Sequence, residues 1–533
     1  MENLARKIRW VFGTEEGPCD KFIPRWIFLR ALGLIYFSAF FSLAFQIKGL
    51  IGPTGILPAN EYLRAVGHSL GIVRRFWFAP TLLWFSSGPH MLDLLCVAGM
   101  IASLLLVINV WPRGMLILCF VCFLSFVSAA QDFSGYQSDG MLLEAGFIAL
   151  FFAPRGWRPR WGVHSPPSRS SLFLLLWEWF RIYFESGVAK IAGGDLEWRN
   201  FTAMDEYYQN GPLPTWIGWY VQHLPHWFHA ATVWATLALE LGFVWMLFLP
   251  RRWRIACFCI VTPWEIGVIL TANYTFLNYL VLALGFLLLD DRFCRRFALR
   301  RWARALHESA ASGPVQREHG KDRSLLRGYG IFKLSTATLI LSWVFYATTV
   351  QLLWMFSTIP FPTTPVEVLD PFRIANRYGL FGVMTRGRYD IEFQGSDDGN
   401  NWVTYPFRFK PQDVTKAPGI YAPYQPRFDW NLWFASLGSW REYPIVAKTE
   451  VSLLSNKRDV LALFAGNPFP QHPPKQVRAV LWQYWFTSMA EKHKTGKWWR
   501  REYIGLYAPT IERSDDGEIR VLQWPSGLGS RTD

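Results

Sequence analysis

Four ionisable side chains stand in an apolar stretch where contact with lipid is expected. The run SLFLLLWEWF, residues 171–180, continues into RIYFESGVAKIAGGDLEWRN, residues 181–200. Glu178, Arg181 and Glu185 are three and four residues apart, so a helix would place them on one face, where Arg181 could pair with either acid. On a straight helix Lys190 would point more than about 100° away from this face, although Gly187 could bend the chain.

Residues of these types in this pattern could do three kinds of chemistry. They could form a structural network that joins helices, or line a site for a ligand or substrate. Lys190 could instead be a catalytic base, because an amine in apolar surroundings loses its proton more easily and can then accept one at ordinary pH. Near the outer end of a span, the same lysine could simply extend to the lipid headgroups. We expect the structural network, and Lys190 and Glu185 are the candidate catalytic residues of the alternative.

Three more acids lie in other apolar stretches: Glu144, Glu240 and Glu265. A charge at the bilayer centre costs at least ~2.5 kcal/mol, so such groups face partners or a cavity. With Glu178, Arg181 and Glu185 they predict an intramembrane polar network. That network could be a proton path, a site for a lipid headgroup or a set of structural contacts between helices.

The elements that position these charges are membrane-spanning helices. Of the 533 residues, 51% are hydrophobic, and 29 tryptophans and 43 phenylalanines are more than a soluble core requires. Aromatic residues favour bilayer interfaces, and several apolar runs reach the ~20 residues that a span needs. We predict a multi-pass α-helical membrane protein with about nine transmembrane helices, centred on residues 26–46, 89–109, 114–130, 138–153, 171–190, 229–249, 254–272, 275–290 and 333–356.

Basic residues gather in alternate connections between these spans. They concentrate in residues 1–25, 154–170, 251–254 and 292–333, whereas the opposite connections 131–140 and 271–275 contain no Lys or Arg. This positive-inside pattern predicts a cytoplasmic N-terminus. It defines a transmembrane domain over residues 1–356, with a basic cytoplasmic loop at 291–332. The basic residues in these cytoplasmic connections explain the net charge of +14, so we expect membrane lipids and no nucleic acid as partners.

The last part of the chain, residues 357–533, has a different pattern of polar and apolar residues. The stretches 388–410 and 501–524 alternate polar and apolar residues around Asp-Gly turns, which predicts β-hairpins. Residues 448–466 have helical spacing up to Gly466. We therefore predict a C-terminal extramembrane α+β domain on the outer, lumenal or periplasmic side. All seven cysteines precede it, so it needs no disulfide framework.

Aromatic and arginine side chains concentrate in APYQPRFDWNLWFASLG, residues 422–438 of this outer domain. These residue types dominate the energetics of protein interfaces. We predict that a partner protein binds here, through Arg427, Trp430, Trp433 and Phe434. One alternative is an amphipathic helix whose aromatic face packs into the core of the domain itself, and another is that the same aromatic residues face the bilayer.

The sequence predicts no metal site and no cofactor. His223, His226 and His229 are three residues apart, but Pro225 interrupts the helix that metal ligation would require. No phosphate-binding Gly loop and no Gly-x-Ser-x-Gly motif occur, so ATP hydrolysis and serine hydrolysis are unsupported.

Four ordered stretches resemble the lipase maturation factor family. They are LIGPTGILPANEYL at 50–63, GYQSDGMLLEAGFIALFFAP at 135–154, FRIYFESGVAKIAGGDLEWRNFTAMDEYYQNGPLPTWIGWY at 180–220, and the pair NRYGLFGVMTRGRYDIEFQGSDDGNNW and PRFDWNLWFASLG at 376–402 and 426–438. The resemblance implies a factor that helps secreted lipases reach their active fold. It implies the endoplasmic-reticulum membrane in a eukaryote and the cytoplasmic membrane in a bacterium.

The stretch YFESGVAKI also resembles the membrane region of vitamin K-dependent γ-carboxylases. That resemblance implies a lysine base, at Lys190, which would deprotonate a reduced quinone. From the first resemblance we expect a chaperone-like membrane maturation factor for exported proteins, with lipase-type clients, rather than an enzyme. The alternative is a membrane enzyme that acts on a quinone-like or lipid-like substrate through the Lys and Glu residues in the membrane.

Overall fold

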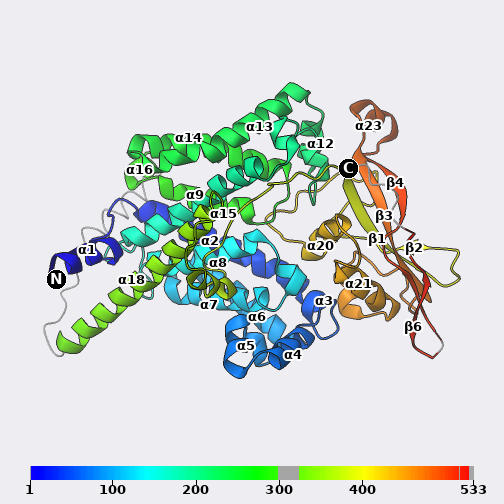
Figure 1. Cartoon of the computed structure of the whole chain (residues 1–533), viewed down its shortest axis with the longest axis horizontal. Coiled ribbons are helices and arrows are strands. Elements are labelled where there is room, and N and C mark those ends of the chain that lie inside the picture. The colour runs from blue at the N-terminus through cyan, green and yellow to red at the C-terminus, as the bar shows by residue number, and fades with distance from the viewer. Residues whose placement is uncertain (1, 298–322, 515, 527–533) are drawn as a thin grey trace.

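A bundle of helices and a sheet-containing domain make up the protein, which is described from a computed structural model. The structure describes residues 2–297, 323–514 and 516–526. Most of the predicted basic loop 291–332 therefore lies outside the described residues. The helices gather toward the N-terminal end of the molecule and the sheet stands at the opposite end (Figure 1).

A helix occupies each of the nine positions where a span is predicted. Their apolar sequences favour helices, because in lipid every backbone polar group must be paired within the segment. Two of the nine helices begin at a proline, a residue that is favoured in the first turn of a helix. The bounds are α2 (Phe22–Ala44), α6 (Pro89–Val107), α7 (Pro112–Val127), α8 (Gln137–Phe152), α9 (Arg169–Ala192), α13 (His226–Leu241), α14 (Arg251–Thr271), α15 (Leu277–Gly285) and α18 (Arg323–Leu353).

Five helical segments of the described chain are long and apolar enough to cross a membrane. They are Phe22–Ala44, Pro89–Val107, His226–Phe248, Arg251–Thr271 and Gly330–Leu353, and the helices Pro112–Val127 and Leu277–Leu288 are apolar but shorter. By this measure α8 and α9 are not spans, because α8 has 16 residues and α9 carries the charged side chains. A multi-pass helical protein is confirmed, and the count of nine crossings stays a prediction.

Short helices fill the connections between the long ones. Among them α12 lies beside the sheet domain (Figure 1), where its Trp219 packs against Tyr484 and Trp499. Their bounds are α1 (Glu2–Phe12), α3 (Ile47–Ile51), α4 (Ala59–Ser69), α5 (Ile72–Phe78), α10 (Leu196–Arg199), α11 (Tyr207–Asn210), α12 (Trp216–Gln222), α16 (Asp291–Phe297) and α19 (Thr364–Glu367).

The sheet of the outer domain is antiparallel, with the strand order β2-β1-β3-β5-β6 and with β4 also paired to β3. Ile391 stands opposite Leu481 and Phe393 opposite Ala479, so one face of β1 and β3 is apolar. The helices α20 and α21 pack on that face. The bounds are β1 (Arg388–Ser396), β2 (Val403–Thr404), β3 (Gln476–Phe486), β4 (Trp499–Leu506), β5 (Thr510–Arg513), β6 (Ile519–Gln523), α20 (Arg427–Ser436), α21 (Pro444–Leu454), α22 (Arg458–Leu461) and α23 (Met489–Thr495).

The hairpin predictions are confirmed, because β1 pairs with β2 and β5 pairs with β6. The helix predicted over 448–466 is wrong in its bounds. The helix α21 ends at Leu454, and Asn456 follows with a left-handed φ of 50°, a conformation that commonly ends helices. The central strand β3, QVRAVLWQYWF, is absent from our prediction, although its β-branched and aromatic residues are typical of strands.

One hydrophobic core runs through both parts of the molecule. Phe28 and Leu142 of the bundle belong to the same buried cluster as Ile391 and Leu453 of the outer domain. The helix α20 lies between the bundle and the sheet (Figure 1). The two parts are therefore in direct contact, and the predicted charges lie where they meet.

Candidate functional site

Arg181 lies at the centre of the buried charges. It sits in the middle of α9, with no side-chain exposure, and forms an ion pair with Glu144 of α8. Its second acidic neighbour is Glu185, one turn further along α9 and 4.0 Å away. The predicted pairing of Arg181 with Glu185 is present. No ion pair joins Arg181 to Glu178 within the described chain, because Glu144 from the neighbouring helix lies closer.

These charges also hold a segment of backbone that follows the last long helix. Glu144 accepts hydrogen bonds from the Asn376 N–H and the Tyr378 hydroxyl, both at 2.9 Å. Glu185 accepts from the Tyr378 N–H at 2.6 Å, and Arg181 donates to the Asn376 carbonyl at 2.6 Å. The acids and the arginine therefore bind both the donors and the acceptors of residues 376–378.

Lys190 extends the same arrangement by one more turn of α9. Its amine donates to Glu240 of α13 at 2.8 Å and to the Leu380 carbonyl at 3.0 Å. The side chain is 3% exposed, so it does not extend to solvent. The Leu380 N–H donates in turn to Ser186, 3.1 Å away. Lys190 therefore points to a different partner from Arg181, as the helical spacing predicts, but it holds the same segment.

We call Glu144, Arg181, Glu185, Lys190 and Glu240, with the segment 376–380 that they hold, the helix clamp. Its groups come from α8, α9 and α13, and each ionised side chain has a partner of opposite charge. Opposite charges in fixed geometry can stay ionised in an apolar site, whereas a single charge there is costly. The helix clamp therefore fixes the backbone that leads into the outer domain.

The two remaining acids of the predicted network lie beside the clamp. Glu265 of α14 accepts hydrogen bonds from the Tyr183 hydroxyl and the Asn278 amide, both at 2.6 Å. Glu178 is fully buried near Glu144, and neither of its carboxyl oxygens has a hydrogen-bond partner among the described residues. Five of the six predicted network residues are thus buried and Glu240 is partly buried, but among the described contacts only Glu144, Arg181 and Glu185 pair with one another.

A second set of contacts joins α20 of the outer domain to the bundle. Arg427 forms two parallel hydrogen bonds to Asp139 at the start of α8, each 2.7 Å long. It also donates to the Phe133 carbonyl at 2.6 Å. Both side chains are buried, and such two-pronged Arg–carboxylate pairs combine strength with fixed geometry.

The predicted aromatic residues of α20 surround this ion pair. Trp430 packs edge-on against Tyr136, and Phe434 lies 5.9 Å from the same ring. The Trp433 indole N–H donates to the Asn210 carbonyl at 3.0 Å. We call Asp139, Arg427, Trp430, Trp433 and Phe434 the seam.

Trp430 and Trp433 are each 8% exposed, and Arg427 is fully buried. All three therefore face other parts of this chain in the structure. That environment is closer to the alternative interpretation of a packed aromatic face, although the face packs on the helical bundle as well as on its own domain. Direct binding of a partner by these residues stays a prediction, and it would require the seam to open.

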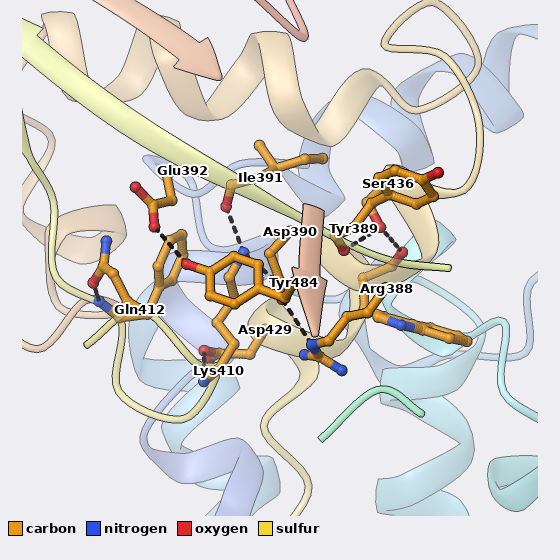
Figure 2. A network of polar contacts seen from close by, with 12 residues as sticks. Arg388, Tyr389, Asp390, Ile391, Glu392, Lys410, Gln412, Asp429, Ser436 and Tyr484 are labelled. Carbon is orange, nitrogen blue, oxygen red and sulfur yellow. Dashed lines mark hydrogen bonds and ion pairs between the residues drawn. The ribbon is translucent and has the colours of Figure 1, made fainter. Parts of the chain in front are cut away.

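A third buried polar cluster lies on the sheet, which the sequence analysis did not identify. Arg388 of β1 pairs with Asp390 at 2.9 Å, and Lys410 lies 3.4 Å from the same carboxylate. Glu392 accepts a hydrogen bond from Tyr484, and Asp429 accepts one from the Lys410 N–H at 3.2 Å (Figure 2). We call Arg388, Asp390, Glu392, Lys410 and Asp429 the sheet network.

The sheet network also reaches the helical part, because Arg388 donates to the carbonyl groups of Gln209, Gly211 and Pro212. The sequence contains a pattern that could have predicted the sheet network. Arg388, Asp390 and Glu392 alternate along one strand, so they stand on the same face of the sheet. Burial raises the pKa of Asp429 to about 6 and lowers the pKa of Lys410 below its usual range.

The three histidines are separated in the structure. The His223 ring nitrogens lie near the carbonyl groups of Trp219 and Thr487, and His226 lies 3.0 Å from Asp205. His229 is buried. In the part of the chain that the structure describes, no cluster of three or more His, Cys, Asp or Glu side chains could hold a metal ion.

Comparison with known proteins finds matches to both parts of the chain. The model of the Lipase maturation factor transmembrane domain matches residues 23–296, and that of the Lipase maturation factor C-terminal domain matches residues 374–509. Chicken Lipase maturation factor 2 is 31% identical over 92% of this chain and 82% of its own length. Bovine Lipase maturation factor 1 is 30% identical over 94% of this chain and 91% of its own length. No solved structure matches the chain.

Proposed function

Because this chain belongs to the lipase maturation factor family, we propose that it is a membrane maturation factor whose clients are lipases. The observation that carries the proposal is that family similarity covers both parts of the chain, the helical bundle and the outer domain. The names of the relatives supply the client class. The contacts between the two parts indicate how the chain could present a client-binding surface.

The outer domain acts as a platform that the bundle holds in one orientation. Support comes from the helix clamp, which fixes residues 376–380, and from the seam, which fixes α20 through the Asp139–Arg427 pair. A rigid platform lowers the conformational entropy that would be lost when a partner binds. The intramembrane charges therefore serve maturation indirectly, by positioning.

We extend the proposal to topology. The chain crosses the membrane nine times, with residues 1–356 as the transmembrane domain and residues 357–533 on the lumenal side of the endoplasmic reticulum. The basic connections support this orientation, and the presence of a helix at each predicted span supports the number of crossings. The relatives reported above are vertebrate proteins, so they give no support to a bacterial membrane.

The comparisons do not support the alternative of a membrane enzyme that acts on a quinone-like or lipid-like substrate. The geometry favours a structural role for both candidate catalytic residues. The Lys190 amine donates to Glu240 and to a backbone carbonyl, and Glu185 accepts a backbone N–H. A base must be within reach of the proton it removes, and these contacts direct both groups toward the protein's own segment 376–380.

The proposed function is tested in cells whose own lipase maturation factors have been deleted. The chain is expressed together with a secreted lipase, and lipase activity per mass of secreted lipase is measured. We expect the chain to raise this specific activity and to leave a co-expressed secreted alkaline phosphatase unchanged. An unchanged specific activity of the lipase would contradict the proposal.

The same assay separates two roles of the seam. If Arg427 holds the platform, R427A lowers both the melting temperature of the purified protein and the specific activity of the lipase. If Arg427 and Trp430 bind the client directly, as predicted from the sequence, R427A or W430A lowers maturation while the melting temperature holds. The buried Asp139–Arg427 pair favours the first result.

A further inference from the structure

A cleft of about 700 Å³ opens beside the helix clamp. One wall is the turn between α7 and α8, with Gln131 and Gln137, and another is the end of α18, with Gln351. The third wall is the chain that leads into the outer domain, with Arg373 and Arg377. We call it the outer cleft. Its volume lies within the range of clefts that bind ligands.

The helix clamp builds the floor of this cleft. Asn376, Tyr378 and Gly140 line it, and the Asn376 side chain donates to the Gly140 carbonyl at 3.0 Å and to Glu144 at 3.1 Å. Gln137 accepts a hydrogen bond from the Gly379 N–H at 3.1 Å, which joins two of the walls. Since the floor is fixed by buried ion pairs, the cleft is formed before any ligand arrives.

The charge that the cleft presents is positive. Arg373 and Arg377 are exposed, and neither guanidinium has an ion-pair or hydrogen-bond partner in the part of the chain that the structure describes. Asp370 is the acidic residue of the lining. Two buried oxygens, Gln351 Oε1 and Ser128 Oγ, also lack hydrogen-bond partners there. The walls therefore offer cationic donors and unused polar atoms side by side.

Backbone strain occurs on two walls of the cleft. Gln131 has a φ of 49° and Arg373 has a φ of 52°, which is the left-handed region that residues with a side chain seldom adopt. Such conformations are unfavourable for residues with a side chain and persist where the surrounding structure requires them. At both positions the strained residue is polar and lines the cleft.

We propose that the outer cleft binds an extended, acidic segment of the client polypeptide, an inference that rests on the proposed function. Carboxylates of the segment pair with Arg373 and Arg377, because a guanidinium and a carboxylate can form two parallel charge-assisted hydrogen bonds. The Gln351 Oε1 oxygen accepts a hydrogen bond from the peptide backbone, because the Gln351 amide nitrogen already donates to the Ala375 carbonyl at 3.2 Å. The cleft is thus a client-binding site next to the platform, built from the residues that the helix clamp fixes.

Peptide binding is measured directly on the full-length protein in detergent. The probe is a fluorescein-labelled peptide of alternating Glu and Ser residues, and the readout is fluorescence anisotropy. We expect R373E/R377E to weaken binding at least roughly tenfold, the effect of 1.4 kcal/mol. The matched control K494E/K497E makes the same charge change at two exposed lysines of α23 and the turn after it, and it should keep the affinity within about twofold. An equal loss in both variants would overturn the proposal.

Two further measurements cover other outcomes. R373Q/R377Q removes the charges without reversing them, and it should weaken peptide binding while the melting temperature stays within a few degrees of wild type. R373G relieves the left-handed strain, so it should keep or raise the melting temperature and still weaken binding. Normal peptide binding by either variant would overturn the proposal. The proposal would also be overturned if the protein did not bind the peptide but bound phosphatidylserine nanodiscs in a way that depends on both arginines.

The lipase assay distinguishes failure of this inference from failure of the proposed function. If wild type raises lipase activity and R373E/R377E does so equally, the function stands and the cleft proposal fails. If wild type does not raise it, the proposed function fails, whatever the peptide measurement gives.

Discussion

The helix clamp and the sheet network are both buried clusters of opposite charges, but they differ in how their groups are paired. In the clamp, the Glu144 carboxylate and the Glu185 carboxylate each bind backbone N–H groups, across sequence separations of 232 and 193 residues. In the sheet network, neither oxygen of Asp390 makes a hydrogen bond to a described residue, although Arg388 and Lys410 lie within ion-pair distance.

The difference follows from what surrounds each cluster. Inside the helical bundle a buried charge without a partner carries a large penalty, so the clamp requires every partner. The sheet network is equally buried, but Asp429 accepts only backbone N–H groups among its described hydrogen bonds, so it can change its protonation state. Breaking one partner should therefore be costly in the clamp and milder in the sheet network, where pH should have an effect.

The largest effect is expected from removal of the clamp's arginine. R181M leaves Glu144 and Glu185 buried without a cation, so we expect a loss of about 3–5 kcal/mol in the free energy of unfolding. The melting temperature of the purified protein in detergent measures it. The matched control is E178Q, because Glu178 is equally buried and lies outside the ion pairs. E178Q should melt at or above the wild-type temperature. Equal losses of stability in R181M and E178Q would contradict the claim that the ion pairs of the clamp stabilise the fold.

A smaller effect is expected at the outer end of the clamp, and it sharpens the comparison. K190M leaves the partly buried Glu240 without its cation, whereas K190M/E240Q removes both charges of the pair. We expect the single variant to lose roughly 2–3 kcal/mol and the double variant to recover part of it, as neighbours in one ion pair are not additive. Strictly additive melting shifts would mean that the two side chains do not interact.

The smallest effect is expected in the sheet network and depends on pH. Burial raises the pKa of Asp429 to about 6 from an ordinary value of 3.8. The folded protein therefore binds a proton more readily than the unfolded chain, and the stability from this group falls as pH rises from about 5 to 7, by roughly 1 kcal/mol. D429N, which keeps an oxygen to accept the backbone N–H groups, should show a smaller fall. The melting temperatures of both proteins at pH 5 and pH 7 test this, and identical pH slopes would contradict it.

The elements of the bundle could be predicted because lipid allows few alternatives. Apolar runs and basic connections located a helix at each expected position. The helical spacing also placed Lys190 apart from Arg181, and the structure gives them different partners. The bounds of α21 and the existence of β3 were harder, because local hydrophobicity alone does not separate a buried strand from other buried segments.

The partners in the site could not be predicted, because they are distant in sequence. Nothing in the run around Arg181 points to Asn376 or Tyr378, and nothing near Arg427 points to Asp139. Arg427 had the residue type of a binding site, and its location in the seam depends on how two parts of the chain meet. The sheet network was missed although its alternation along β1 was visible, because charged residues on a strand usually face solvent.

The central claim is that the buried charges of the helix clamp fix the segment that enters the outer domain. Hydrogen exchange at the Asn376, Tyr378 and Leu380 amides tests it most directly, because these amides donate to Glu144, Glu185 and Ser186. We expect exchange that is slow in wild type and in E178Q, and at least roughly tenfold faster in R181M, since loss of the cation weakens the acceptors. If these amides exchange in wild type as fast as the exposed turn 397–400, or equally fast in all three proteins, the segment is not held by the charges.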